Sequence, residues 1–139
     1  MEANQELTTT TLERLRQACG TWYRSDPESD RAMWSRREPV SLFGALGPCK
    51  AGWPEVEATF RRTAARFSDP DITTDFDVVE VGSDLADTVG YEHGQVAIDG
   101  TRQPVKVRVT HIFRREHGEW RIVHRHGDLA PVDDSPSVT

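Results

Sequence analysis

Three histidines and two carboxylates are expected to lie on one face of a β-sheet. His111, His124 and His126 lie in the C-terminal third of the chain, Asp128 follows two residues later, and Glu92 lies in an earlier segment. An imidazole with an ordinary pKa and a carboxylate whose pKa is raised by burial form an acid/base pair suited to proton transfer. The residue types therefore predict a cofactor-free acid/base site.

The turn signal His117-Gly118 decides which of these side chains share a face. A two-residue hairpin turn sets the register of the flanking strands, and paired residues lie on the same face. The pairs expected on the apolar face are Arg115/Trp120, Phe113/Ile122, His111/His124, Val109/His126 and Val107/Asp128. Arg125 is expected on the opposite face, among other arginines.

A second turn, Asp99-Gly100, extends the same face to an earlier strand. The same arithmetic places four residues beside the central strand: Ala86, Thr88, Gly90 and Glu92. An alternative register stays open, because Pro104 cannot donate to a ladder and is compatible with a bulge. That slip would bring Tyr91 and His93 to the apolar face instead.

Apolar and aromatic side chains are expected to line a small-molecule pocket around these groups, as such pockets combine an apolar wall with few polar groups. The expected substrate-binding residues are Trp34, Phe43, Trp53, Thr88, Tyr91, Val109 and Phe113. The histidines have a second interpretation, as hydrogen-bonded side chains that fill the core. Their spacing lacks a metal-binding motif, so we expect neither a metal nor a cofactor.

The periodicity predicts helices first and strands second. A Ser/Thr-x-x-Glu pattern at Thr10 opens a helix over residues 10–23, Asp26-Pro27 opens a short second helix, and Pro54 opens a third that ends at Ser68-Asp69-Pro70. Strands are expected over residues 40–43, from 72 onward, and over 85–98, 105–115 and 119–128. This order is typical of an α+β fold in which helices cover one face of a curved antiparallel sheet.

Length and charge limit the classes of function. The chain has 139 residues and a net charge of −6 without a basic run, so we expect one domain and no nucleic-acid partner. The polar N-terminus and short apolar runs predict no signal peptide, no membrane span and a cytoplasmic location. Cys19 and Cys49 are expected to be reduced thiols. Flexible tails are expected at residues 1–7 and 130–139, around a domain at 8–129.

A family resemblance rests on three segments: Gly52-Trp53-Pro54-Glu55-Val56, Val109-Thr110-His111-Ile112-Phe113-Arg114-Arg115 and Gly118-Glu119-Trp120-Arg121-Ile122-Val123-His124-Arg125-His126. Together they resemble the SnoaL-like, ketosteroid-isomerase-type superfamily over about residues 8 to 129. The resemblance implies the cone-shaped nuclear-transport-factor-2-like fold, with N-terminal helices over a strongly curved sheet that encloses an apolar pocket. It also implies a homodimer that packs through the outer face of the sheet.

The last segment also resembles the association domain of calcium/calmodulin-dependent protein kinases. That resemblance places His111 in the cavity and matches the paired histidines of the family to His124 and His126. The ketosteroid isomerase pattern is incomplete, because Ser41-Leu42-Phe43-Gly44 stands where a catalytic aspartate is expected and Thr110 where a second one is. We therefore do not expect true ketosteroid isomerase activity.

Two functions follow as expectations. The first is a cofactor-free isomerase, cyclase or dehydratase, polyketide cyclase-like in type, acting on a small apolar carbonyl or epoxide-type compound. Glu92 or Asp128 would be the base, and His111 and His124 would orient or protonate the developing oxyanion. The alternative is a non-catalytic ligand-binding or oligomerisation module with the same fold.

Overall fold

The computed structural model describes residues 10–130. In this range, helices come first and long strands follow, so the predicted α+β class is confirmed. The expected N-terminal tail and nearly all of the expected C-terminal tail lie outside the described residues. No helix between residues 10 and 130 combines the length and apolarity needed to cross a membrane.

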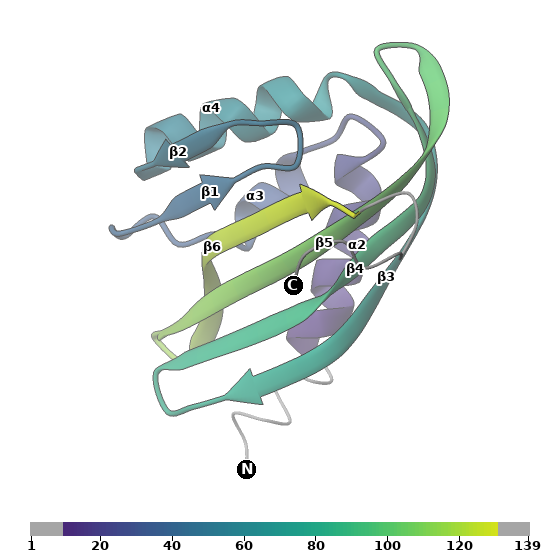
Figure 1. Ribbon diagram of the computed structural model, residues 1–139. Coiled ribbons are helices and arrows are strands. Elements are labelled where there is room, and N and C mark those ends of the chain that lie inside the picture. Colours follow the sequence, from purple (N-terminus) through teal and green to yellow (C-terminus); the bar gives the residue numbers. More distant parts are fainter. Residues whose placement is uncertain (1–9, 131–139) are drawn as a thin grey trace, which may run out of the picture.

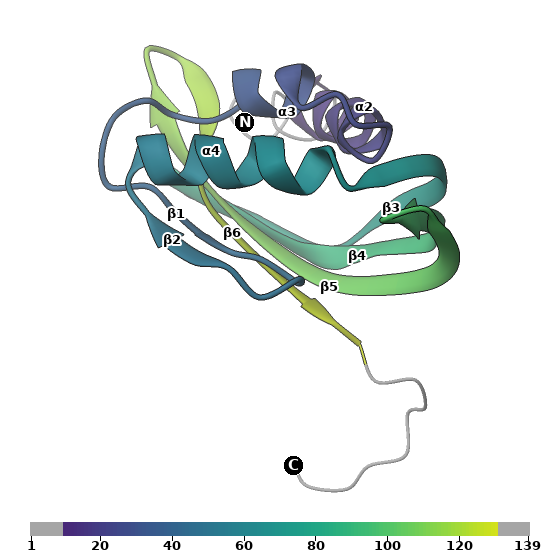
Figure 2. The same ribbon diagram turned by 90° about the horizontal axis from the view of Figure 1, so that it is seen from above.

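Three helices cover one face of the sheet (Figures 1 and 2). Helix α2 spans Leu12–Trp22, and its buried residues are Leu12, Leu15, Ala18, Cys19 and Trp22. Helix α3 spans Glu28–Ala32, and the Asp26 carboxylate accepts the Glu28 N–H at 3.1 Å. Helix α4 spans Trp53–Ala64, and Pro54 occupies its first turn.

Six strands form a single sheet in the order β2-β1-β6-β5-β4-β3. Their bounds are β1 Ser41–Phe43, β2 Cys49–Ala51, β3 Phe67–Val81, β4 Leu85–Ile98, β5 Thr101–Glu116 and β6 Glu119–Leu129. Strand β1 runs parallel to β6, and every other neighbouring pair is antiparallel. Two predictions were wrong here. Residues 49–51, for which no strand was predicted, form β2. The helix predicted to end at Ser68-Asp69-Pro70 ends at Ala64, because β3 already begins at Phe67, which pairs with Ile98.

The β4–β5 register is the one predicted from the Asp99-Gly100 turn. Thr88 pairs with His111 and Glu92 with Val107, without any shift along the two strands. Pro104 pairs with Gln95 and causes no bulge. The alternative register is therefore wrong.

The β5–β6 register departs from the prediction at a β-bulge. Phe113 pairs with Ile122 as expected, but Ile112 pairs with His124, so Val123 is an extra residue on β6. One extra residue moves every later side chain of β6 to the other face. His111 consequently pairs with Arg125, and the predicted pairs of His111, Val109 and Val107 with His124, His126 and Asp128 are wrong.

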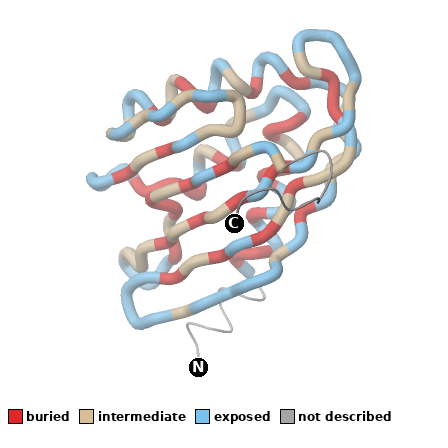
Figure 3. Tube along the Cα trace, in the orientation of Figure 1, coloured by how far each residue is buried: buried red, intermediate tan, exposed pale blue. Residues whose placement is uncertain are grey.

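The core lies between the helices and the inner face of the sheet, where the buried residues of Figure 3 gather. Trp22 packs edge-on against Phe67 and Tyr23, with ring centroids 4.9 and 5.0 Å apart, and Trp34 packs against Phe60 at 5.4 Å. These aromatic side chains fix α2 and α4 over the sheet.

Two glycines let β3 pack closely against β4. A Cβ on Gly90 would lie 1.9 Å from the Asp75 carbonyl oxygen, and one on Gly94 would lie 1.9 Å from that of Asp71. Because both obstacles are backbone atoms, no side-chain movement can relieve the overlap. These positions therefore require glycine for steric reasons.

We expect Gly90→Ala to lower the free energy of unfolding by about 2–3 kcal/mol, because the added methyl group overpacks the β3–β4 pair. Gly20→Ala is the matched control, since a Cβ at Gly20 on α2 meets no atom within 4 Å. That change should raise stability by about 0.5–1 kcal/mol through helix propensity. Urea titrations of both variants measure the difference, and equal stabilities would contradict the steric argument.

Candidate functional site

An ion pair lies at the centre of the fold, on the inner face of the sheet. Arg125 Nη1 donates to Glu92 Oε2 at 2.6 Å, and Arg125 Nη2 donates to Glu92 Oε1 at 2.8 Å. Glu92 is 1% exposed and Arg125 is 5% exposed. This two-pronged arrangement is the strongest form of an arginine–carboxylate contact.

Three strands and the end of a helix bring this pair together. Glu92 lies in β4 and Arg125 in β6, separated by β5, whose His111 pairs with Arg125. From the end of α2, the Tyr23 hydroxyl donates to Glu92 Oε1 at 2.7 Å. The guanidinium of Arg125 also lies over the ring of Trp22, 5.5 Å from its centroid. The helix and sheet layers therefore meet at one polar cluster.

The charges of Glu92 and Arg125 stabilise each other. Burial alone would raise the pKa of Glu92, but the charge and hydrogen bonds of Arg125 lower it to about 2. Burial likewise opposes the charge on Arg125, but Glu92 raises the pKa of the guanidinium above its ordinary value. Both groups are ionised at neutral pH.

Three neighbours of the pair are neutral at pH 7. Burial, reinforced by the charge of Arg125, lowers the pKa of His111 to about 3. Its Nε2 lies 3.5 Å from Arg125 Nη1. Burial and the charge of Glu92 raise the pKa values of Tyr23 and Cys19.

Asp30 on α3 is a further buried carboxylate near this cluster. Burial raises its pKa to about 6, although the charge of Arg125 opposes the shift. Its Oδ1 atom has no hydrogen-bond partner among residues 10–130. The cluster thus combines a cation at Arg125, an anion at Glu92 and a carboxyl group at Asp30 that ionises near neutral pH.

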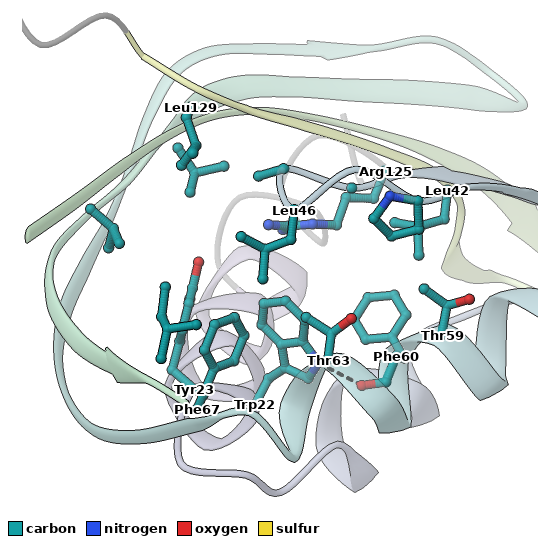
Figure 4. Close-up of a pocket in the computed structure, with 16 residues that line it drawn as sticks. Trp22, Tyr23, Leu42, Leu46, Thr59, Phe60, Thr63, Phe67, Arg125 and Leu129 are labelled. Atoms are coloured by element: carbon teal, nitrogen blue, oxygen red, sulfur yellow. Dashed lines mark hydrogen bonds between the residues drawn. The ribbon is translucent and has the colours of Figure 1, made fainter. Parts of the chain in front are cut away.

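A cavity opens beside Arg125, between the sheet and the helices. It encloses about 40 Å³, room for a few water molecules. Figure 4 shows Leu42, Leu46 and Arg125 on one side, and the rings of Tyr23, Phe67, Trp22 and Phe60 on the other. Its other lining residues are Gly44, Ala45, Pro48, Thr59, Thr63, Ile98, Val105, Val107 and Leu129. The wall is apolar except for Arg125, Tyr23 and two threonines.

The turn between β1 and β2 forms part of the cavity wall. The Gly44 N–H bonds to the Pro48 carbonyl at 2.8 Å, and the Gly47 N–H bonds to the Gly44 carbonyl at 2.9 Å. Ala45 and Leu46 lie between these bonds and line the cavity.

The structure separates the predicted acid/base residues. Glu92 and His111 lie together in the buried cluster, whereas His124 and His126 project from the outer face of β6. The His124 Nδ1 atom is 2.7 Å from the Ser41 hydroxyl, and partial burial and His126 lower its pKa. Asp128 is also on the outer face, where Arg108 Nε donates to its carboxylate at 2.8 Å and lowers its pKa. The bulge at Val123 is the reason for this separation.

The pKa predicted for the base was also wrong. Burial was expected to raise the pKa of Glu92 toward neutrality, but Arg125, which the sequence pattern placed on the opposite face, lowers it. Arg125 and Tyr23 were missed as site residues. The alternation of residues 122–126 hid Arg125, because one bulged residue reverses it. Tyr23 lies four residues after Cys19 and is buried on the same face, but as the last residue of the predicted helix it was not assigned to the site.

The predicted substrate-binding residues lie outside the lining of this cavity. Trp34, Thr88, Val109 and Phe113 are buried in the core, and Trp53 packs against Trp34 with ring centroids 6.3 Å apart. Phe43 is 43% exposed and contacts His124 and His126 on the outer face. Tyr91 is on the outer face as well, under Lys106. Among residues 10–130, no three His, Cys, Asp or Glu side chains are grouped in a way that could hold a metal ion.

Helices packed over one face of a curved sheet are the nuclear-transport-factor-2-like fold, an α+β class. Residues 13–132 match the SnoaL-like domain. The chain therefore belongs to the SnoaL-like family. Among the curated proteins, none matches it.

Solved structures support the fold at low sequence identity. A ketosteroid isomerase-like protein from Erwinia carotovora atroseptica is 17% identical, with a TM-score of 0.76 over 96% of this chain and 99% of that one. A candidate dehydratase of the NTF2-like family from Streptomyces avermitilis is 19% identical, with a TM-score of 0.73 over 93% and 99%. A candidate calcium/calmodulin-dependent protein kinase type II association domain from Thiobacillus denitrificans is 21% identical, with a TM-score of 0.61 over 75% and 82%. These likenesses concern the fold alone.

We expect Glu92→Gln to lower the free energy of unfolding by about 3–5 kcal/mol at pH 7, because it leaves Arg125 buried without a counter-charge. The pKa of Glu92 is about 2 in the folded protein, below its unfolded value. Its stabilising contribution is therefore present above about pH 4.5 and is lost as the pH falls toward 2. Urea titrations between pH 2.5 and 7 should show a larger acid-dependent loss in the wild type than in the variant, which keeps only the other carboxylates with a lowered pKa, such as Asp128.

Asp128→Asn is the control, because it also breaks an arginine–carboxylate pair, but an exposed one on the outer face. Its effect on stability should be small. A large loss in Asp128→Asn together with a small one in Glu92→Gln would show that the buried pair does not have the role assigned to it.

Proposed function

We propose that the chain binds a small, largely apolar carbonyl or epoxide-type compound in the cavity beside Arg125. The observation that supports this proposal most directly is the lining of the cavity. Its wall is apolar, and among the described residues that form it Arg125 is the only charged one. Apolar walls with a few converging polar groups are typical of small-molecule sites. An oxygen of the ligand would accept a hydrogen bond from the guanidinium, and the aromatic wall would exclude water.

We further propose that the bound compound undergoes cofactor-free isomerisation, cyclisation or dehydration. Removal of a proton next to a carbonyl group places negative charge on the carbonyl oxygen, and donors already fixed beside that oxygen stabilise the charge. Arg125 is the donor beside the cavity, since Tyr23 gives its single hydroxyl hydrogen to Glu92, and Glu92 contacts both residues at 2.6–2.8 Å. In this proposal Glu92 accepts the proton, as the sequence suggested.

A non-catalytic ligand-binding protein is the second candidate, and the pKa of Glu92 favours it. At about 2, that pKa makes the carboxylate a weak base. Both carboxylate oxygens are also occupied by hydrogen bonds from Arg125 and Tyr23. Neither a carboxylate nor an imidazole is among the residues that line the cavity in the described part of the chain.

Hydrogen exchange of a simple ketone distinguishes the two candidates. We expect the protein to accelerate exchange of the methyl hydrogens of acetophenone in D2O, followed by proton NMR, because enolisation is common to the proposed reactions. Arg125→Met should reduce exchange about tenfold or more, as removal of one oxyanion donor does elsewhere. Arg108→Met, which removes an arginine paired with Asp128 on the outer face, should leave exchange unchanged.

Binding without exchange, seen as shifts of protein resonances on addition of acetophenone, would select the non-catalytic candidate. Absence of both binding and exchange for a series of small ketones and epoxides would contradict the proposed function.

We also propose that two copies associate through the outer face of the sheet. The strand pairing places one row of side chains across that face: Val78, Val89, Thr110, His126 and Phe43. Phe43, Val78 and Val89 are each 40–43% exposed, and apolar side chains grouped in this way favour association. Light scattering should give twice the chain mass of 15.7 kDa.

Val89→Glu should shift the protein to a monomer, because it buries a charge in the row. Gln17→Glu on α2 adds the same charge on the helical side and should leave the dimer intact. A wild-type monomer, or a dimer that withstands Val89→Glu, would contradict association through this face.

A further inference from the structure

The arginine that lines the cavity is already paired with a buried carboxylate. Within residues 10–130, Arg125 is the only charged residue that lines the cavity, and its charge is already matched by Glu92. The carboxylate occupies both terminal nitrogens of the guanidinium, in the geometry that a bound carboxylate would otherwise take. The cation is therefore present without a net positive charge to attract an anion.

The surrounding groups add no positive charge. Burial keeps His111 neutral, since its pKa is about 3, and Asp30 adds a buried carboxyl group with a pKa of about 6. Arg125 and Glu92 both act on Asp30 electrostatically, so the three groups share one environment. At pH 7 the cluster has a net charge between zero and −1, so the carboxylate of a ligand would add a buried negative charge without a counter-charge.

A neutral acceptor oxygen of a ligand can still accept a hydrogen bond from Arg125. Each terminal nitrogen of a guanidinium carries two hydrogens, and Glu92 uses one on each. Gly127 lies next to Nη2, because a Cβ there would be 3.5 Å from that atom and 3.2 Å from Val107 Cγ1, which belongs to a cavity-lining residue. No side chain at Gly127 covers Nη2, and Arg125 itself lines the cavity.

We propose that Glu92 is a specificity-determining residue, which makes the cavity select ligands with a neutral acceptor oxygen and reject the carboxylates of the same shape. This inference rests on the proposed function, because it requires that the cavity bind a small molecule. It adds the charge class of the ligand and the residue that sets it. Glu92 acts here through Arg125, since it occupies the positions on the guanidinium that a ligand carboxylate needs.

Acetophenone and benzoate test the selection, because they share a phenyl ring and a carbonyl group and differ in a methyl group against a charged oxygen. Protein NMR titrations at pH 7 measure both affinities for the wild type and for Glu92→Gln. We expect the wild type to bind acetophenone at least about tenfold more tightly than benzoate. Glu92→Gln should gain at least about tenfold in benzoate affinity, because its Arg125 has no counter-charge.

Thermal unfolding gives a second measurement of benzoate binding. Benzoate should raise the Tm of Glu92→Gln, because a ligand that binds the folded state stabilises it. It should have little effect on the Tm of the wild type. Tyr23→Phe and Asp128→Asn are the controls: the first removes a hydrogen bond to Glu92 and keeps its charge, and the second removes a carboxylate on the outer face. Neither should gain benzoate affinity.

The outcomes separate the inference from the proposed function. Wild-type protein that binds benzoate as tightly as acetophenone overturns the inference while leaving ligand binding intact, and this comparison decides the matter even if Glu92→Gln does not fold. A folded Glu92→Gln that binds acetophenone but gains nothing for benzoate also overturns it. If the wild type binds neither compound, the proposed function fails and the inference fails with it.

Discussion

The buried pair of Glu92 and Arg125 is the constraint on which the rest of the interior depends. Moving two charges out of water costs several kcal/mol for each ion, and only close, two-pronged contact offsets that cost. Here three strands and the end of α2 hold the two groups at 2.6–2.8 Å, and Tyr23 satisfies a further lone pair of the carboxylate. A buried pair does not by itself stabilise a fold more than apolar side chains of the same volume. Its consequence here is a polar wall at a defined place in an apolar cavity.

The bulged residue Val123 determines which polar side chains lie beside the cavity. With Val123 as a bulge, the β6 residues that follow it exchange faces, so Arg125 faces the helices while His124, His126 and Asp128 face outward. Without the bulge, the interior would hold two more histidines and an aspartate, and acid/base groups would surround the cavity. The chemistry open to the site therefore changes from proton transfer by imidazole to hydrogen-bond donation by a guanidinium that is already paired.

Much of the fold could be predicted from local pattern, because helix stripes, hairpin turns and strand alternation are written in short windows. The Asp99-Gly100 turn determined the β4–β5 register and correctly placed Glu92, Thr88 and His111 on the inner face. A bulge has no comparable local signal, because the apolar and polar residues of Ile122-Val123-His124 are compatible with either register. The position of the β1–β2 turn in the cavity wall could not be predicted either. It depends on β1 pairing in parallel with β6, which is a contact between distant segments.

The coupling between Glu92 and Arg125 is the most direct test of the central role of this pair, and a double-mutant cycle of unfolding free energies measures it. The cycle compares the wild type, Glu92→Gln, Arg125→Met and the double variant at pH 7. We predict a favourable coupling of about 2–3 kcal/mol, with the double variant more stable than the sum of the single losses implies. A coupling below about 0.5 kcal/mol would mean that the two side chains act independently, and would contradict the central place given to the pair.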